Sequence, residues 1–112
     1  MPKVLVAGYG VIGQRLADGV SLQDDMELVG VVDAAPTLPV LALRDKGMPY
    51  KLFTAYAGAE KDLAAAGVAV AGNMEDVLPD VDIVLDASPG GVGAKNKVCL
   101  LYTSDAADIL LV

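Results

Sequence analysis

Apolar and polar positions alternate along the chain in a way that predicts strands followed by helices. The run Lys3–Ala7 is short, apolar and β-branched and is followed by a glycine, which is typical of a buried parallel strand. In the segment 11–22 the apolar residues instead recur every four positions, as in an amphipathic helix. The run Glu27–Asp33 predicts a second strand. Strand, helix and strand within about thirty residues predict a right-handed βαβ unit.

The rest of the chain continues this alternation up to residue 87. Three further helices are predicted at 38–46 (with Thr37 as cap and Gly47 as stop), 57–66 and 74–78 (with Asn73 and Asp76 as capping residues). Three further strands are predicted at 50–54, 68–71 and 82–87. The fold class is therefore α/β, a doubly wound parallel sheet of about four to five strands with helices on both faces. We expect the order 3-2-1-4, with the far edge of the last strand unpaired.

Composition and charge narrow the function classes. The chain has 112 residues, of which 54% are hydrophobic, and a net charge of -7 without any run of Lys or Arg, so we expect no nucleic-acid partner. It has no apolar stretch of about 18 residues and no signal peptide, so we expect no membrane span and a cytoplasmic location. One cysteine and no histidine leave little for acid–base chemistry.

The motif that carries chemistry is a glycine-rich turn between the first predicted strand and helix. Its sequence is Gly8-Tyr9-Gly10-Val11-Ile12-Gly13. The first glycine allows a tight turn, the second lets a pyrophosphate approach the backbone, and the third lets helix and strand pack closely. The phosphates would lie at the positive end of the helix. This context predicts a Rossmann-type dinucleotide site. Its candidate cofactor-binding residues are those of the motif, Gly8, Tyr9, Gly10, Val11, Ile12 and Gly13.

An acidic residue follows at the spacing that such a site requires. Asp33 ends the second strand, 20 residues after Gly13, where a carboxylate would accept hydrogen bonds from the adenosine ribose. A ligand-free glycine turn with a loop-capping Asp33 is the alternative, and the joint spacing favours the nucleotide. A carboxylate also repels the 2′-phosphate of NADP, and Ala34 and Ala35 supply no cation. Arg44 would supply a cation only if its helix folded back over the site. We therefore predict NAD, with NADP as the alternative.

A second turn follows the last predicted strand. It contains Ser88-Pro89-Gly90-Gly91, at the carboxyl end of a strand, where open α/β sheets bind ligands. Ser88 and Pro89 are therefore candidate cofactor contacts. A plain strand-to-helix turn explains the same residues equally well.

Several segments of the chain stand at a spacing that is found in one enzyme family. The segments are Gly8-Tyr9-Gly10-Val11-Ile12-Gly13-Gln14-Arg15, Ala17-Asp18, Gln23-Asp24-Asp25-Met26, Val29-Gly30-Val31, Ala66-Gly67-Val68-Ala69-Val70-Ala71-Gly72 and the run from Asp82 to Asn96. Together they resemble the archaeal-type (type II) glyceraldehyde-3-phosphate dehydrogenases, and the resemblance covers residues 1–98 with a weaker part at about 37–61. The chain then corresponds to an N-terminal fragment of such an enzyme.

The resemblance implies a reaction and a set of binding residues. Members oxidise glyceraldehyde 3-phosphate with phosphate to 1,3-bisphosphoglycerate and reduce NAD or NADP, using a cysteine nucleophile that we expect beyond residue 98. No catalytic residue is therefore assigned in this chain. Pyrophosphate contacts carry over to Gly8, Gly10, Val11, Ile12 and Gly13. Asp33-Ala34-Ala35 stands where many members have residues for a 2′-phosphate. The resemblance also implies a small-molecule substrate and a homotetrameric parent.

The final segment departs from the family. Residues 99–112, called the tail below, begin with Cys99 and look like a translated sequencing adapter up to Asp108. We therefore expect a partial NAD(P)-binding Rossmann domain at 1–98, a non-native tail at 99–112 and no catalytic domain, and we do not interpret Cys99 as the nucleophile.

Two other functions fit the glycine motif. One is a fragment of another Rossmann dehydrogenase similar to diaminopimelate or homoserine dehydrogenase, and the other is a freestanding nucleotide-binding module. An incomplete sheet and half a dinucleotide site disfavour the freestanding module. For the isolated chain we expect weak dinucleotide binding, a tendency to aggregate and no activity.

Overall fold

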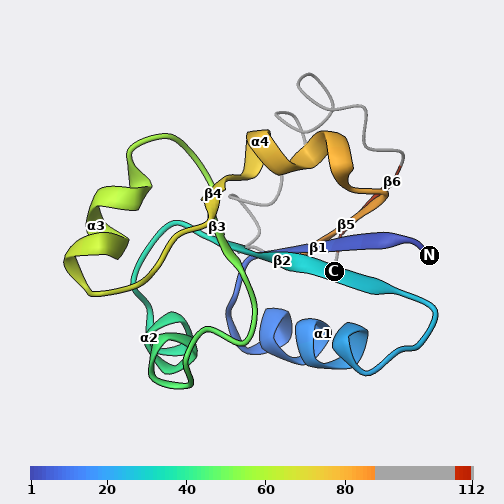
Figure 1. The fold of residues 1–112 in the computed structure, drawn as a ribbon, viewed down its shortest axis with the longest axis horizontal. Helices are drawn as coiled ribbons and strands as arrows, with labels where there is room; N and C mark the ends of the chain where they lie inside the picture. The colour runs from blue at the N-terminus through green and yellow to red at the C-terminus, as the bar shows by residue number, and fades with distance from the viewer. Residues whose placement is uncertain (88–107, 112) are drawn as a thin grey trace.

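The first third of the chain forms the predicted βαβ unit. In the computed structural model, which describes residues 1–87 and the backbone of residues 108–111, strand β1 (Lys3–Ala7) leads into helix α1 (Val11–Ser21) and strand β2 (Glu27–Asp33) (Figure 1). β1 and β2 pair in parallel. Both strands have the predicted bounds, and α1 ends one residue before the predicted end.

The remaining elements alternate in the predicted way. They are α2 (Leu38–Asp45), β3 (Leu52–Thr54), α3 (Ala59–Ala65), β4 (Gly72–Asn73), α4 (Met74–Val77), the 3-10 turn η1 (Leu78–Asp80), β5 (Ile83–Asp86) and β6 (Asp108–Leu111). Every pair of neighbouring strands is parallel. The predicted α/β, Rossmann-type fold class is confirmed.

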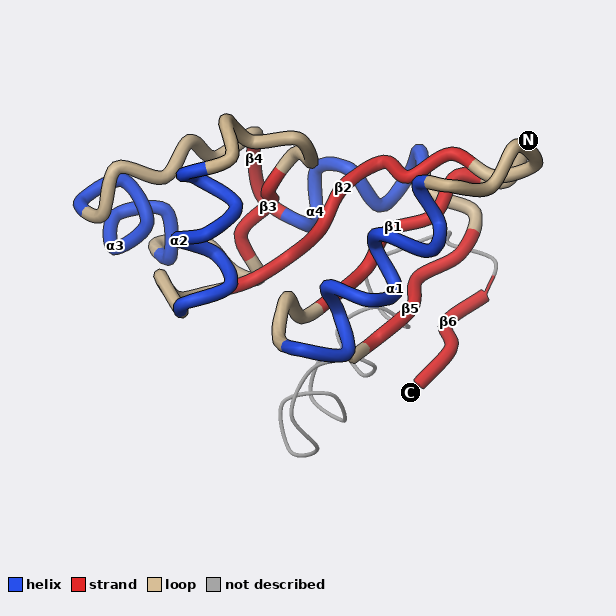
Figure 2. The backbone as a smooth tube through the Cα atoms, turned by 90° about the horizontal axis from the view of Figure 1, so that it is seen from below, coloured by secondary structure: helices blue, strands red, loops and turns tan. Residues whose placement is uncertain are grey.

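The strands form one sheet in the order β4-β3-β2-β1-β5-β6. The chain winds outward from β1 to β4 and then returns to the other side of β1 with β5. The carboxyl ends of β1 and β5 therefore lie side by side where the winding direction reverses, and open α/β sheets bind ligands at this point. Figure 2 shows β4 and β6 at the two edges of the sheet.

The prediction of an unpaired edge on the last strand of the 3-2-1-4 order was wrong. β6 pairs with β5 over four residues, from Ile83 opposite Asp108 to Asp86 opposite Leu111. The physical reason is that an exposed parallel edge presents unpaired N–H and C=O groups, and an extended apolar segment can satisfy them. This segment comes from the tail, so sheet order alone does not tell a native strand from an added one.

The predicted strand at 68–71 was also wrong, because the strand at this edge is Gly72–Asn73. The N–H of Val68 donates to the Leu63 carbonyl at 2.9 Å, which closes the end of α3. The chain reaches the sheet only at Ala71, whose N–H donates to the Leu52 carbonyl at 2.8 Å. The first residue of the predicted strand, Val68, therefore serves to end α3 and does not pair with the sheet.

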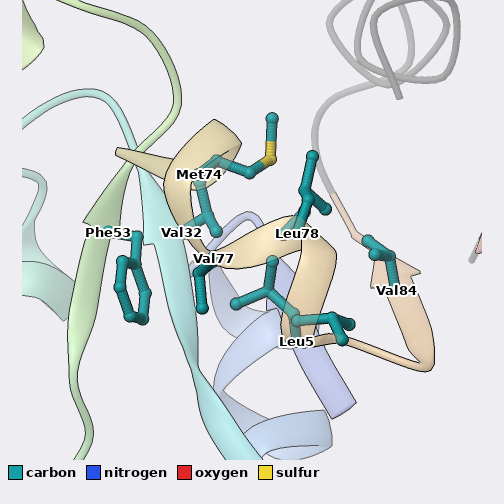
Figure 3. Packing of buried hydrophobic residues seen from close by; sticks show 9 residues of the cluster. Leu5, Val32, Phe53, Met74, Val77, Leu78 and Val84 are labelled. Carbon is teal, nitrogen blue, oxygen red and sulfur yellow. The ribbon is translucent and has the colours of Figure 1, made fainter. Parts of the chain in front are cut away.

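Both faces of the sheet are covered, so the strands are apolar on both sides. One face packs against α1, α2 and α3 through Val6, Tyr9, Ala17, Val31, Val40, Leu43, Leu52, Leu63 and Val68. The other packs against α4 and η1, and Figure 3 shows its side chains converging from strands and helix. Its members are Leu5, Ala7, Val32, Phe53, Met74, Val77, Leu78, Val81 and Val84.

A glycine within β2 makes room for the core. The register between β1 and β2 shifts between Val4 and Leu5, which pair with Leu28 and Gly30. A Cβ on Gly30 would lie 2.6 Å from the Phe53 ring and 2.7 Å from a backbone carbonyl. This position therefore accepts only glycine without movement of β3, a constraint that the sequence pattern does not reveal.

Within the described residues, no helix is long and apolar enough to cross a membrane.

Candidate functional site

The glycine motif forms the connection between β1 and α1, at the carboxyl end of the sheet. Gly8 has a φ of 93°, a left-handed conformation that side chains other than glycine rarely adopt. Its N–H donates to the Val32 carbonyl at 2.8 Å, which ties the turn to β2. Gly10 then precedes α1 in an extended conformation, and its carbonyl accepts the N–H of Gln14 at 2.9 Å. The predicted strand–turn–helix context is present.

Two glycines of the motif face opposite environments. A Cβ on Gly13 would lie 1.8 Å from the Gly8 carbonyl oxygen, so the absence of a side chain lets α1 pack against the turn. A Cβ on Gly10 would meet nothing within 4 Å. The turn is therefore closed on the protein side at Gly13 and open on the outer side at Gly10. These are the roles that the motif requires for binding a pyrophosphate.

The first turn of α1 is open to solvent. Val11 and Ile12 are 65% and 54% exposed, although both are large apolar residues. No acidic residue lies in this turn, so no carboxylate occupies the positive end of the helix dipole. An anion can approach the backbone N–H groups there.

Tyr9 has a different position from the rest of the motif. Its side chain is only 6% exposed and packs in the core between the sheet and α1, α2 and α3. Its N–H donates to Oδ2 of Asp33 at 3.1 Å. Tyr9 therefore anchors the turn through its side chain and its backbone, and its ring lies away from the open side of the turn.

Asp33 lies beside the glycine turn, as its spacing predicts. It is half-buried at the carboxyl end of β2, and its Oδ1 accepts the N–H of Ala34 at 2.7 Å. Together with the Tyr9 bond, each carboxylate oxygen accepts one backbone N–H. An ionised carboxylate has about four acceptor positions, so hydroxyl groups can still be bound. The same contacts also satisfy the loop-capping alternative, so Asp33 serves the turn with or without a ligand.

Arg44 is engaged away from Asp33. Its guanidinium contacts Oδ1 of Asp45, with Nη2 at 2.9 Å, and donates from Nη1 to the Ala66 carbonyl at 2.6 Å. These contacts hold the side chain between α2 and the end of α3. Arg44 would have to leave both partners to neutralise a phosphate near Asp33.

A tyrosine–aspartate cluster lies near the end of α1 that is away from the glycine turn. The Tyr50 hydroxyl donates to Oδ1 of Asp18 at 2.5 Å and lies 3.3 Å from the Ser21 hydroxyl. The hydrogen bond to Asp18 raises the pKa of Tyr50, partly offset by the Ser21 contact. Burial raises the pKa of Tyr9, with Asp18 and then Tyr50 adding to the effect. The cluster links α1 to the segment before β3.

Asp86 is a buried carboxylate beside the candidate site that the sequence analysis did not single out. It ends β5, is 1% exposed and pairs with Ala7, directly before the glycine turn. A carboxylate that ends an apolar strand is the signal that could have identified it. The two other predicted contacts, Ser88 and Pro89, lie outside the described residues. In the part of the chain that the structure describes, no three His, Cys, Asp or Glu side chains gather as a metal site.

A hollow lies at the opposite end of the sheet. It has a volume of about 710 Å³ and is lined by residues at the starts of strands, among them Lys3, Glu27 and Lys51. Ligands of open α/β sheets bind at the carboxyl ends of the strands. We therefore assign the candidate site to the glycine turn and not to this hollow.

Comparison with known proteins identifies relatives of the chain. It is 47% identical over 98 residues to a glyceraldehyde-3-phosphate dehydrogenase of Thermococcus kodakarensis, covering 85% of the chain and 28% of the relative. It is 46% identical over 95 residues to the enzyme of Sulfolobus acidocaldarius, covering 85% and 27%. The predicted resemblance to the archaeal-type glyceraldehyde-3-phosphate dehydrogenases is confirmed.

The chain spans little more than a quarter of the length of these curated relatives, and it matches their N-terminal part. It matches no protein-family model. Among solved structures, it is similar to a saccharopine dehydrogenase from Saccharomyces cerevisiae, with a TM-score of 0.61 and 20% identity over 99% of this chain and 21% of that protein. At this identity the likeness supports the fold alone.

Proposed function

We propose that the chain is the dinucleotide-binding part of a phosphorylating glyceraldehyde-3-phosphate dehydrogenase and that it binds NAD at the β1–α1 turn. The observation that carries this proposal is the contrast within the glycine motif, closed at Gly13 and open at Gly10. The names of the relatives supply the reaction class.

Each residue of the proposed site has a role that its environment permits. The backbone from Gly8 to Gly13 would hold the pyrophosphate, with the N–H groups of the first α1 turn facing the anion. Asp33 would accept hydrogen bonds from the adenosine ribose through its remaining acceptor positions. Ser88 and Pro89 would add contacts from the end of β5. The bound cofactor would supply hydride acceptance, which no side chain provides.

The preference for NAD over NADP rests on charge. A 2′-phosphate would approach the Asp33 carboxylate, and the following residues, Ala34 and Ala35, carry no positive charge. Arg44 is already engaged with Asp45 and the Ala66 carbonyl. Like charges in close contact disfavour binding, so NADP should bind more weakly.

The parent enzyme would oxidise glyceraldehyde 3-phosphate with phosphate to 1,3-bisphosphoglycerate, using a cysteine outside this chain. We propose a cytoplasmic homotetramer for the parent. The isolated chain should bind the cofactor weakly and lack activity. The names of the relatives favour this function over a diaminopimelate or homoserine dehydrogenase fragment and over a freestanding module.

Binding measurements on the 112-residue chain test the cofactor proposal. Calorimetric titration should give a measurable affinity for NAD. The affinity for NADP should be weaker by roughly 10-fold or by a larger factor. Asp33→Ser should lower the affinity for NAD and reduce the difference between the NAD and NADP affinities. Asp25→Ser changes a surface carboxylate in the turn before β2 and should leave the affinities for NAD and NADP unchanged. Equal affinity of the native chain for NAD and NADP would contradict the preference, and no binding of either would contradict the site.

Sequencing the source locus across the codon for Val98 tests the domain proposal. We propose that residues 1–98 are the native partial domain and that residues 99–112 are an added tail. A reading frame that continues into a cysteine-bearing catalytic domain supports this division. A genomic stop codon after Val112 would contradict it and favour the freestanding module.

A further inference from the structure

The hollow at the amino-terminal ends of the strands has an apolar floor. Phe53 and Val77 are buried members of the core cluster in Figure 3, and both also line the hollow. Val29 packs against the same cluster and adds to the lining. The hollow lies away from the glycine turn, so the proposed dinucleotide site does not account for it. Its volume of about 710 Å³ is large enough to take an apolar side chain from another molecule.

Two large apolar side chains protrude beside this hollow. Met1 lines its edge and is 75% exposed. Leu22, which follows Ser21 of the lining and caps the end of α1, is 80% exposed. The connection from α1 to β2, which carries Leu22, lies beside the N-terminus in Figures 1 and 2. One face of the molecule therefore carries both a protruding leucine and a hollow with an apolar floor.

The rim of the hollow carries both signs of charge. Lys3, Glu27, Lys51 and Asp80 line it with exposed side chains. Within the described residues none of these four forms an ion pair. A wholly acidic or wholly basic partner would meet two like charges on this rim. A second copy turned about a two-fold axis would instead bring lysines toward carboxylates, because a two-fold contact places the same surface on both sides.

We propose that two copies of this chain pair through this face about a two-fold axis, with Leu22 of each copy entering the hollow of the other. The rim charges then pair across the contact. A reciprocal contact is closed, so association stops at two copies. The inference does not depend on the proposed dinucleotide site, which lies at the other end of the sheet. One leucine and one small floor on each side make a modest contact, so the dimer should be weak.

Sedimentation equilibrium of the 112-residue chain tests the pairing. The net charge of -7 opposes association, so the measurement is made at about 0.15 M salt, which screens this repulsion. The native chain should dimerise with a Kd on the order of 10–100 µM. Leu22→Asp would place a carboxylate on the apolar floor and should raise this Kd by roughly 10-fold or more. Leu38→Asp makes the same change at an 83% exposed position at the start of α2 and should leave the Kd unchanged.

Two variants with opposite rim charges test the electrostatic part. Lys3→Glu with Lys51→Glu makes the rim acidic, and Glu27→Lys with Asp80→Lys makes it basic. Each double variant alone should stay monomeric at concentrations where the native chain dimerises. An equimolar mixture of the two should form dimers again, because unlike rims then face each other. Urea unfolding verifies that each variant folds.

A matched control separates the rim from net charge, and three results would overturn the proposal. Lys46→Glu with Lys61→Glu changes the net charge equally at exposed positions outside the hollow and should still dimerise. A native chain that stays monomeric up to about 500 µM, well above the expected Kd, would assign the hollow to another occupant. A dimer that Leu22→Asp leaves unchanged, or that Leu38→Asp weakens equally, would place the contact elsewhere.

Discussion

At the residue scale, α1 contains one glycine that the structure requires and one that it would allow to be replaced. Gly13 and Gly19 lie in the same helix, yet a Cβ would lie 1.8 Å from a backbone oxygen at Gly13 and would meet nothing within 4 Å at Gly19. The sequence motif distinguishes them only by spacing. The structure supplies the reason, which is the contact between the helix and the Gly8 carbonyl.

Alanine substitutions at these two positions should have opposite effects on stability. Gly13→Ala must push α1 away from the turn, so it should lower the free energy of unfolding by about 2 kcal/mol or more and weaken NAD binding. Gly19→Ala should raise stability by about 0.5–1 kcal/mol, because alanine is the better helix former, and leave NAD binding unchanged. Urea unfolding and NAD titration of both variants check this. Equal stability of the two variants would contradict the packing role of Gly13.

At the scale of elements, the Tyr50–Asp18 hydrogen bond fastens α1 to the segment that enters β3. This contact holds the helix whose first turn forms the proposed phosphate site. It also makes stability depend on pH, because the hydrogen bond to Asp18 raises the pKa of Tyr50 above its usual value of 10.0. A raised pKa means that folding favours the protonated hydroxyl. The contribution of the Tyr50–Asp18 hydrogen bond to the stability of the fold is complete below about pH 10. This contribution is lost as the pH rises through the raised pKa of Tyr50.

Tyr50→Phe should therefore change the alkaline limb of the stability profile. The variant should be less stable at neutral pH by a few tenths to about 1 kcal/mol, and its stability should fall less steeply above about pH 10. Burial also raises the pKa of Tyr9, so part of the alkaline loss should remain. Urea unfolding from pH 7 to about pH 11 measures both effects. Tyr56→Phe, at an exposed position, is the control, and a Tyr50→Phe profile parallel to that of the native chain would refute the role of the hydrogen bond.

At the scale of the whole molecule, sheet completion depends on a strand from the tail. β6 covers the edge of β5. β5 lies beside β1 at the point where the winding direction of the chain reverses. Pairing at this edge therefore protects the strand end that adjoins the glycine turn. An unpaired parallel edge invites association with other chains.

Deleting residues 108–112 should expose the edge of β5. The shortened chain should unfold at a temperature lower by roughly 5 °C or more and should aggregate at lower concentration. Deletion of Val112 alone leaves Asp108–Leu111 intact and should behave as the full chain does. Thermal unfolding and light scattering distinguish the two. Identical curves for both deletions would show that β6 contributes nothing to stability.

Much of this molecule follows from its sequence, because the relevant signals are local. The bounds of β1 and β2 follow from short apolar runs, and the glycine turn follows from three glycines at the required spacing. The position of Asp33 beside the turn follows from the near-constant geometry of a βαβ unit. These predictions use residues that are near one another in the chain or linked by one standard crossover.

Tertiary structure decided the features that depend on contacts between distant segments. Tyr9 became a core residue because α1 and the strands enclose its ring, and Gly30 became obligatory because Phe53 of β3 lies against it. Asp86 lies beside the glycine turn because β5 returns next to β1, and β6 closed an edge that the strand pattern left open. The carboxylate at the end of an apolar strand marks Asp86 in the sequence, but no local pattern shows which strand or ring will face Asp86, Tyr9 or Gly30 after folding.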